Sequence, residues 1–184
     1  YRSERTGAAV VDPAYPRDWQ AFGSSCCFLN SGEIVSKGID TEIAGEILPG
    51  WQISASYTYN KNENRGDEIV PYTSDVPNHL AKIWSSYQFS GPLARLKIGG
   101  GMTAQSRIYR DWNDWSSGTI KHSEQGGYSV WNAMAEYQFT DAIRATLNVN
   151  NLFDKIYFAS VGNYGEGAWY GEPRNVMLTL RARY

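Results

Sequence analysis

The last nine residues of the chain, 176–184, alternate between apolar and polar side chains. Such a period of two predicts a β-strand with one apolar face and one polar face. The polar face carries Arg181 and Arg183, and the segment ends on the aromatic Tyr184. In a soluble β-sandwich the apolar face would pack into a protein core. In a transmembrane barrel it would contact lipid and leave the arginines in an aqueous lumen.

The same alternation recurs along the chain and is clearest in residues 51–60. Apolar side chains from Trp51 to Tyr59 occupy the odd positions, and polar side chains occupy the even positions. A tilted strand of about ten residues spans the apolar band of an outer membrane, and aromatic residues at both ends suit the two interfacial girdles. We therefore expect about eight antiparallel strands and no helix. The other expected strands cover residues 2–11, 33–47, 81–89, 95–105, 132–139, 143–150 and 176–184.

Short and long connections alternate between these strands. Tight turns are expected near Pro49, Gly91 and Asp141, where the sequence has turn-forming residues. If Tyr184 is periplasmic, counting strands backward places these turns on the periplasmic side and the long connections outside. Outer-membrane barrels show this asymmetry, and a soluble sandwich has no reason to show it. The long connections cover residues 12–32, 61–77, 108–126 and 151–173.

Charged side chains lie on the polar faces, opposite the apolar ones. An unpaired charge in a dry protein core is very costly, so these positions suit a lumen that holds water or another polar protein element. An antiparallel sheet with one solvated face gives the same alternation but does not explain where the loops and aromatic residues lie. The charged residues are Asp40, Glu42, Glu46, Lys82, Arg95, Lys97, Glu136, Arg144, Arg181 and Arg183.

The overall charge and hydropathy exclude other classes of protein. A net charge of -2 leaves no broad basic patch, so we expect no nucleic-acid partner. The mean hydropathy is -0.48, and no apolar run approaches the roughly 18 residues of a membrane helix. Alternating barrel strands have unremarkable mean hydropathy, so the barrel remains compatible with this value.

No catalytic or metal-binding constellation stands out, and we expect no enzymatic activity. His79 and His122 are the only histidines, and neither lies in a recognisable catalytic motif. Residues 99–101 are three glycines without the Lys-Ser/Thr of a phosphate loop, so close packing or a strand bend is expected there. Cys26 and Cys27 are adjacent, a spacing unlike that of metal-ligand pairs. A loop disulfide and two loop thiols both remain open for them.

Several segments resemble the C-terminal part of TonB-dependent outer-membrane receptors, in the ferric-siderophore branch. The most specific is Asn148-Val149-Asn150-Asn151-Leu152-Phe153-Asp154-Lys155-Ile156-Tyr157, followed by Gly171-Glu172-Pro173-Arg174-Asn175 before the final strand. Their order and spacing make the set specific, and together they extend from about residue 33 to the end. The weaker segments are 36–42, 45–51, 56–59 and 76–80.

This resemblance implies a barrel of about 22 strands, closed by an N-terminal plug. Residues 1–184 would be the C-terminal segment of that barrel, without the plug and without the energy-coupling box. The implied protein lies in the bacterial outer membrane, contacts membrane lipid, binds a ferric siderophore and imports it through TonB acting on the plug. The siderophore carries the iron, so no protein metal site or cofactor is expected. The strand that ends at Tyr184 also resembles the signal read by the barrel-assembly machinery.

The expected outer loops are rich in aromatic residues, which offer large contact area at low entropic cost. Arg107, Arg110 and Lys121 would attract an anionic ligand. For any one ring, a girdle or loop-packing role is the alternative. The candidate ligand-binding residues are Tyr109, Trp112, Trp115, Tyr157, Tyr164, Trp169 and Tyr170.

Two other classes of protein remain open. A small self-contained outer-membrane barrel would close its own eight strands, as small barrels do. A secreted β-sandwich binding module would be soluble without detergent.

Overall fold

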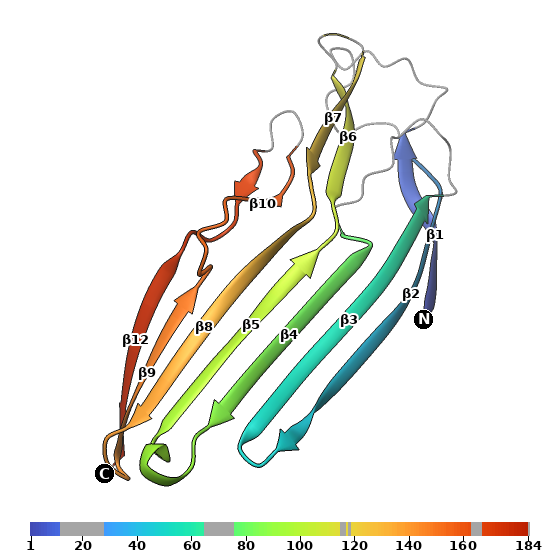
Figure 1. The fold of residues 1–184 in the computed structure, drawn as a ribbon. Helices are drawn as coiled ribbons and strands as arrows, with labels where there is room; N and C mark the ends of the chain where they lie inside the picture. The colour runs from blue at the N-terminus through green and yellow to red at the C-terminus, as the bar shows by residue number, and fades with distance from the viewer. Residues whose placement is uncertain (12–27, 65–75, 115–116, 118, 163–166, 184) are drawn as a thin grey trace.

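Eight long antiparallel strands form one curved sheet in the computed structural model, which describes residues 1–11, 28–64, 76–114, 117, 119–162 and 167–183. In Figure 1 these strands lean side by side in a single layer. The order in the sheet is β1-β2-β3-β4-β5-β8-β9-β12, so each strand of the sheet pairs with the previous one. The bounds are β1 Arg2–Val11, β2 Phe28–Leu48, β3 Trp51–Asn64, β4 His79–Gln88, β5 Leu96–Gln105, β8 Tyr128–Gln138, β9 Ile143–Asn150 and β12 Asn175–Ala182.

Four shorter strands lie at one end of this sheet. β6 (Ile108–Asp114) and β7 (Thr119–Gln125) form a hairpin, and β10 (Phe158–Ser160) pairs with β11 (Trp169–Tyr170). Both pairs lie above the long strands in Figure 1, whereas the tight turns lie at the opposite end. One of those turns contains a 3-10 turn, η1 (Gly91–Leu93). The predicted asymmetry of the connections is therefore confirmed.

The strand register aligns the apolar side chains on one face. Ala135, Leu147 and Leu178 lie directly opposite one another across β8, β9 and β12, and the same parity runs through the other strands. Many large side chains on this face are exposed: Ile43 on β2 is 69% exposed and Leu178 is 64% exposed. One apolar face thus points away from the rest of the protein, as the period of two predicts.

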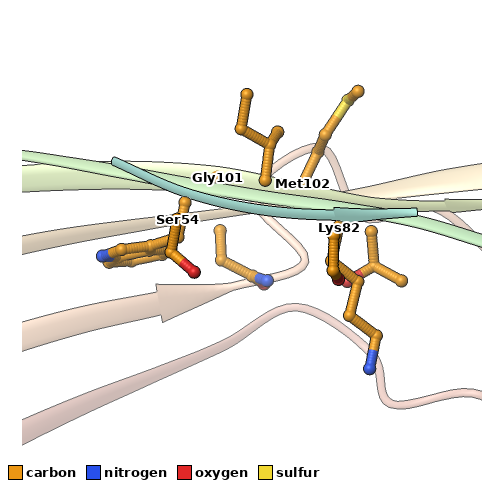
Figure 2. A pocket seen from close by; sticks show the side chains of 9 residues that line it. Ser54, Lys82, Gly101 and Met102 are labelled. Atoms are coloured by element: carbon orange, nitrogen blue, oxygen red, sulfur yellow. The ribbon is translucent and has the colours of Figure 1, made fainter. Parts of the chain in front are cut away.

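The opposite face is polar and partly paired. Arg144 lies 3.6 Å from the Glu136 carboxylate across β8 and β9, and the Thr146 hydroxyl donates to the same carboxylate at 3.0 Å. Figure 2 shows Ser54 and Lys82 on one side of the sheet and Met102 on the other. Ser54 and Lys82 border a shallow hollow of about 230 Å³ on the polar face.

The hollow lies beside the three glycines of β5. A Cβ at Gly101 would lie 2.7 Å from the Trp84 ring and 2.2 Å from the carbonyl oxygen of Ile83. The inward-facing indole therefore packs on a backbone that has no side chains, a common way to stabilise glycine in a strand. This confirms the close packing expected for residues 99–101.

Aromatic side chains form two groups on the apolar face, one near each end. Near the tight turns, Tyr87 contacts Phe89 edge to face at 5.0 Å, and Tyr137 contacts Phe139 at 5.1 Å. Toward the outer loops, His79 lies between Tyr57 and Tyr59, at 6.1 and 5.1 Å between ring centroids. Trp131 and Phe153 continue this second group at 6.3 Å.

Some predicted boundaries are wrong. β2 begins at Phe28 rather than near residue 33, β3 continues to Asn64, and β4 begins at His79. The connections 12–32 and 61–77 are shorter than predicted, because long paired strands continue into them. Connection 108–126 is mainly a β-hairpin, and connection 151–173 contains β10 and β11.

The two other fold classes are wrong for this chain. The eight-stranded sheet ends at β1 and β12, which do not pair with each other, so the strands do not close into a small barrel. A sandwich would bury a second sheet against the first. Among the described residues, the only buried apolar side chains are Val35, Ile108 and Val161, and Leu178 and its neighbours remain exposed. Val35 has the same parity as Ile43 on β2, so the alternation predicts it on the exposed apolar face, but it is fully buried.

No helix in the described part of the chain is long and apolar enough to span a membrane. Cys26 and Cys27 lie outside the described residues.

Candidate functional site

The β6–β7 hairpin presents a polar face at the outer-loop end of the sheet. Asp111 lies directly opposite His122, and Tyr109 lies opposite Glu124. Because alternate residues of a strand share a face, these four side chains lie together. The Tyr109 ring stacks on the His122 ring at 5.7 Å, and the Arg107 guanidinium lies 5.6 Å from the centroid of the Tyr109 ring.

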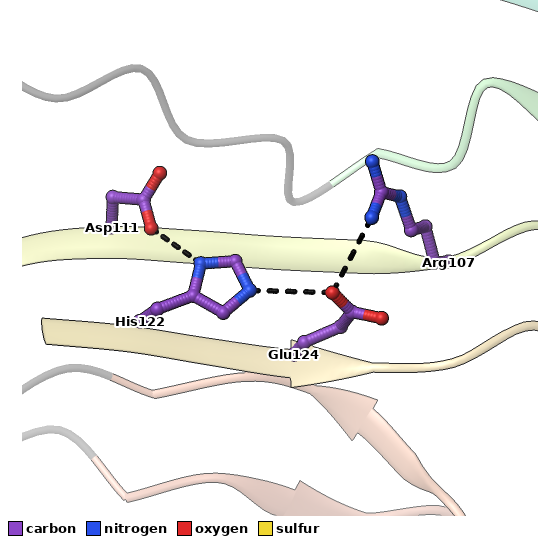
Figure 3. Close-up of polar contacts among 4 residues, drawn as sticks. All are labelled: Arg107, Asp111, His122 and Glu124. Atoms are coloured by element: carbon purple, nitrogen blue, oxygen red, sulfur yellow. Dashed lines mark hydrogen bonds and ion pairs between the residues drawn. The ribbon is translucent and has the colours of Figure 1, made fainter.

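His122 is held between two carboxylates, as Figure 3 shows. Its Nδ1 lies 2.5 Å from Asp111 Oδ1, and its Nε2 lies 3.2 Å from Glu124 Oε2. These two hydrogen bonds, that of Asp111 first, raise the pKa of His122 above its usual value near 6.5. The protonated imidazole is a donor at both nitrogens, so it makes two charge-assisted contacts: one crosses the hairpin to Asp111 on β6, and the other joins Glu124 on its own strand, β7.

Arg107 extends this network at the base of the hairpin. Its guanidinium lies 3.5 Å from Glu124, the same carboxylate that contacts His122. The positive charge predicted to attract an anionic ligand is therefore partly compensated within the hairpin.

Asn151 anchors the other outer loop directly after β9. Its side chain is 2% exposed and its φ is 50°, a left-handed conformation that Asn tolerates. The amide donates to the carbonyl oxygens of Lys155 at 2.9 Å and Glu172 at 3.0 Å, and its oxygen accepts from the Lys155 N–H at 2.8 Å. One buried side chain thus joins the start of the loop to its return before β12.

Two further contacts close the same loop. Asp154 accepts a hydrogen bond from the Arg174 N–H at 3.1 Å. Gly171 donates its N–H to the carbonyl oxygen of Tyr157 at 2.9 Å, and a Cβ at Gly171 would lie 1.9 Å from the Tyr157 ring. Only glycine leaves room for this ring. The sequence segments 148–157 and 171–175 therefore form one hydrogen-bonded unit.

The two outer loops are in contact with each other. The Phe158 N–H at the start of β10 donates to the Gln125 side chain at the end of β7, at 2.9 Å. The Tyr157 ring lies 4.3 Å from the ring of Tyr128, the first residue of β8. The Phe158 ring in turn stacks on Tyr170 at 4.5 Å. These contacts fix the second loop against the base of the hairpin.

The predicted ligand-binding residues fall into two groups and a remainder. Tyr109 lies on the hairpin, where it contacts His122, while Tyr157, Trp169 and Tyr170 lie together on the second loop. Trp169 is 74% exposed and Tyr170 is 68% exposed, whereas Tyr157 is half-buried. Trp112 lies in β6, but the structure does not describe its side chain. Trp115 and Tyr164 lie outside the described residues.

The sequence did not predict the partners of His122 or the role of Asn151. Asp111 and Glu124 can be recognised as partners of His122 only if residues 108–125 form a hairpin, because the register of that hairpin brings Asp111 opposite His122. The alternation of Tyr109, Asp111 and Asn113 with other residues was the available signal. No group of three His, Cys, Asp or Glu side chains among the described residues is arranged to hold a metal ion.

Comparison with known proteins places this arrangement among receptors. Residues 1–152 match the family model described as "TonB dependent receptor-like, beta-barrel". The chain is 38% identical over 189 residues to the ferric-pyoverdine M114 receptor PbuA of Pseudomonas sp. (strain M114), covering 100% of this chain and 22% of that protein. It is 31% identical over 156 residues to the catecholate siderophore receptor Fiu of Escherichia coli, covering 80% of this chain and 19% of that protein.

A solved structure shows the same fold. The pyoverdine outer-membrane receptor FpvA of Pseudomonas aeruginosa, bound to pyoverdine, superposes with a TM-score of 0.83 at 30% identity, over 100% of this chain and 26% of that one. The chain thus spans about a quarter or less of the relatives that it matches. These relatives are named as receptors rather than enzymes, and the family is one of outer-membrane barrels, which confirms the predicted fold and location. The chain belongs to the TonB-dependent receptor-like β-barrel family.

Proposed function

We propose that residues 1–184 form the C-terminal part of an outer-membrane receptor that binds a ferric siderophore and imports it in a TonB-dependent manner. The observation that carries this proposal is the match over the whole chain, at 38% identity, to a ferric-pyoverdine receptor. The geometry agrees with it: a barrel wall with one apolar and one polar face carries two connected loops at one end.

The apolar face is the surface that contacts membrane lipid in this proposal. Ile43 and Leu178 belong to a continuous apolar surface and are largely exposed. A soluble protein rarely leaves such a continuous apolar surface exposed. Strand β3 shows the distance between the two aromatic groups. Trp51 lies at the level of one group and Tyr57 belongs to the other, and the two residues are six positions apart, or about 20 Å along the strand. Interfacial girdles of barrels flank an apolar band of this order of height.

The open edges of the sheet support a longer barrel. β1 and β12 each leave one row of backbone groups without a partner strand in this structure. In lipid, each unsatisfied backbone group costs several kcal/mol, so only closed barrels are stable there. Further strands of the receptor would pair with both edges. The polar inner face would then surround the plug on which TonB acts. Strand β12 would also carry the signal for the barrel-assembly machinery.

The outer loops supply the ligand contacts in this proposal. Trp169 and Tyr170 offer exposed rings on a loop fixed by Asn151, and Tyr109 offers a ring on the hairpin. Tyr157 packs against Gly171 and Tyr128, so we assign it a positioning role. Trp112, Trp115 and Tyr164 remain candidates from the sequence. The siderophore would hold the iron itself.

A chimaeric receptor tests the proposal. Residues 1–184 replace the matching segment of the Pseudomonas aeruginosa ferripyoverdine receptor, and heat-modifiable migration on gels verifies that the barrel has folded. Binding of ferric pyoverdine and of a ferric catecholate is measured by quenching of protein fluorescence. Uptake of radioactive iron is compared in cells with and without TonB. We expect binding of at least one chelate and uptake only with TonB. A folded chimaera that binds neither chelate would contradict the proposal.

Matched variants locate the ligand contacts. Trp169→Ala and Tyr170→Ala are each expected to weaken binding about tenfold, as truncation of an aromatic anchor does. Phe153→Ala is the control, because Phe153 is equally exposed but lies beside Trp131 on the lipid-facing side. If binding weakened equally in all three variants, the assignment of ligand contacts to Trp169 and Tyr170 would be wrong.

A further inference from the structure

Gln125, the last residue of β7, joins the hairpin to the loop after β9. Its side-chain oxygen accepts a hydrogen bond from the Phe158 N–H at 2.9 Å, across 33 positions of sequence. Its side-chain nitrogen donates to the carbonyl oxygen of Gly126 at 2.8 Å, directly after the strand. The oxygen and the nitrogen of this amide thus each have a partner, and the two contacts together set the orientation of the side chain.

The end of the hairpin that carries Gln125 is itself well supported. Gln125 lies directly opposite Ile108, which is 1% exposed. Because alternate residues of a strand share a face, both lie on the face of the hairpin opposite His122. Strand β8 of the wall begins three residues later, at Tyr128. Gln125 therefore belongs to the part of the hairpin that is fixed to the wall, and it can serve as an anchor.

Phe158 connects this anchor to the exposed aromatic rings. Phe158 lies opposite Tyr170 in the β10–β11 pair, and the two rings stack at 4.5 Å with their planes 28° apart. Trp169 is the other residue of β11. A pair of strands of three and two residues has few backbone hydrogen bonds, and an isolated two-stranded pair is marginally stable in water. The hydrogen bond from Phe158 to Gln125 is therefore a substantial part of what orients this pair.

The other anchors of the loop act at its base. Asn151 and Asp154 join the start of the loop to its return before β12. These contacts fix where the loop begins and ends, but they do not set how β10 and β11 lean toward the hairpin. The contact from Gln125 supplies that direction, and β7 and β10 lie next to each other at the outer end of the sheet in Figure 1.

We propose that Gln125 is a positioning residue for the chelate, because its hold on the Phe158 N–H orients the rings of Trp169 and Tyr170 relative to the hairpin. The inference rests on the proposed function, in which these two rings contact the ferric siderophore. The two outer loops then form one surface that is ordered before the ligand arrives, which lowers the entropic cost of binding. Gln125 itself does not contact the ligand.

The first experiment measures the anchor without ligand, in the full receptor that carries this chain, purified in nonionic detergent. Gln125→Leu removes both side-chain hydrogen bonds at similar volume, whereas Gln125→Glu keeps an oxygen that accepts from Phe158. Hydrogen exchange at the Phe158 amide should become about fivefold faster in Gln125→Leu, the factor that one hydrogen bond of typical net strength supplies. Exchange should stay near the unsubstituted rate in Gln125→Glu. Ser123→Ala, on the same face of β7, is the control.

The second experiment measures binding of ferric pyoverdine and of a ferric catecholate, each labelled with radioactive iron. For a chelate that the unsubstituted receptor binds, Gln125→Leu should weaken binding about fivefold, and Gln125→Glu should restore it. In a receptor that already carries Trp169→Ala and Tyr170→Ala, Gln125→Leu should weaken binding by less than about twofold, because the rings through which it acts are gone. In a Tyr109→Ala receptor the effect should remain about fivefold, since Tyr109 lies on the other face of the hairpin.

The outcomes separate this inference from the proposed function. Unchanged exchange at Phe158 in Gln125→Leu, with heat-modifiable migration intact, would overturn the inference, and so would unchanged chelate binding. A fivefold loss that persists without the two rings would show that Gln125 contacts the chelate directly, and the positioning role would be wrong. A receptor that binds neither chelate before any substitution would contradict the proposed function instead.

Discussion

The barrel wall and the outer loops are stabilised in different ways. In the wall, backbone hydrogen bonds run along whole strands, and β2 pairs with β3 from Ile34 to Leu48 almost without interruption. In the outer loop after β9, a few side chains replace that ladder, chiefly Asn151 and Asp154. A substitution in the wall therefore affects stability through the environment, lipid or water, that the face of the strand contacts. A change in the loop acts through individual hydrogen bonds and close contacts.

This difference also separates two kinds of information in the sequence. Wall residues all follow the same alternation of apolar and polar side chains, so no single residue is indispensable to that alternation. Loop residues each have a particular partner. Four predictions, from the largest expected effect to the smallest, can break or sharpen this comparison.

The largest effect is expected from a charge on the lipid-facing side of the wall. Leu178 lies midway between the two aromatic groups, opposite Leu147. Leu178→Arg should destabilise the folded receptor by about 2–4 kcal/mol, the cost of an arginine at the middle of a membrane on a barrel strand. The measurement is guanidinium unfolding of the receptor refolded in lipid vesicles.

The neighbouring residue provides the matched control for that experiment. Thr179 has the opposite orientation and lies opposite Thr146 on the polar face. Thr179→Arg should therefore cost less than about 1 kcal/mol in the same assay, because an inward-facing arginine remains in a polar environment. Equal costs for the two arginines would show that both faces contact the same kind of solvent, and the lipid-facing assignment would be wrong.

The loop after β9 should respond strongly to loss of its buried amide. Asn151→Ala removes all three hydrogen bonds of that side chain and leaves part-buried backbone groups of Lys155 and Glu172 without these partners, at about 1–3 kcal/mol. Hydrogen exchange at the Lys155 amide measures this directly, since its N–H donates to the Asn151 side chain. Asn150→Ala is the control, because Asn150 donates to Asn175 instead. An unchanged exchange rate at Lys155 in Asn151→Ala would contradict the anchoring role.

The sequence predicted the wall better than the loops for the same physical reason. The period of two in residues 51–60 and 143–150 fixed both faces, and the register confirms each pairing. It could not fix the lengths of β2 and β3, because their outer ends lose the alternation while the backbone pairing continues. The resemblance identified residues 148–157 and 171–175 as a set. Their shared anchor at Asn151 depends on contacts between residues 21 positions apart, which no local pattern encodes.

A smaller effect is expected where the loop is held by shape. Gly171→Ala would place a methyl group 1.9 Å from the Tyr157 ring, so the ring or the loop must move. Overpacking of this kind costs about 1–3 kcal/mol where the surroundings are rigid, and an outer loop should give way at the lower end. Ligand binding by the receptor should weaken severalfold. The double variant Gly171→Ala/Tyr157→Ala should recover part of the loss. No recovery would show that the ring is not the obstacle.

The smallest effect is a pH dependence of the β6–β7 hairpin. Asp111 and Glu124 raise the pKa of His122 above its usual value near 6.5. A raised pKa in the folded state means that the imidazolium favours the paired hairpin. This contribution is fully present below pH 6.5 and is lost as the pH rises through the folded-state pKa. Amide exchange across β6 and β7 should therefore be slower at pH 6 than at pH 9, after correction for the intrinsic rate.

Two variants decide whether His122 causes that dependence. His122→Asn cannot titrate in this range, so the corrected exchange of the hairpin amides should no longer change between pH 6 and pH 9. Asp111→Asn weakens the shorter of the two hydrogen bonds, so the pKa of His122, followed by NMR of its ring protons, should move back toward 6.5. The hairpin effect should then end at a lower pH. A pH dependence that persists in His122→Asn would assign it to other groups. The loop would then be held, like the wall, by backbone pairing that pH does not alter.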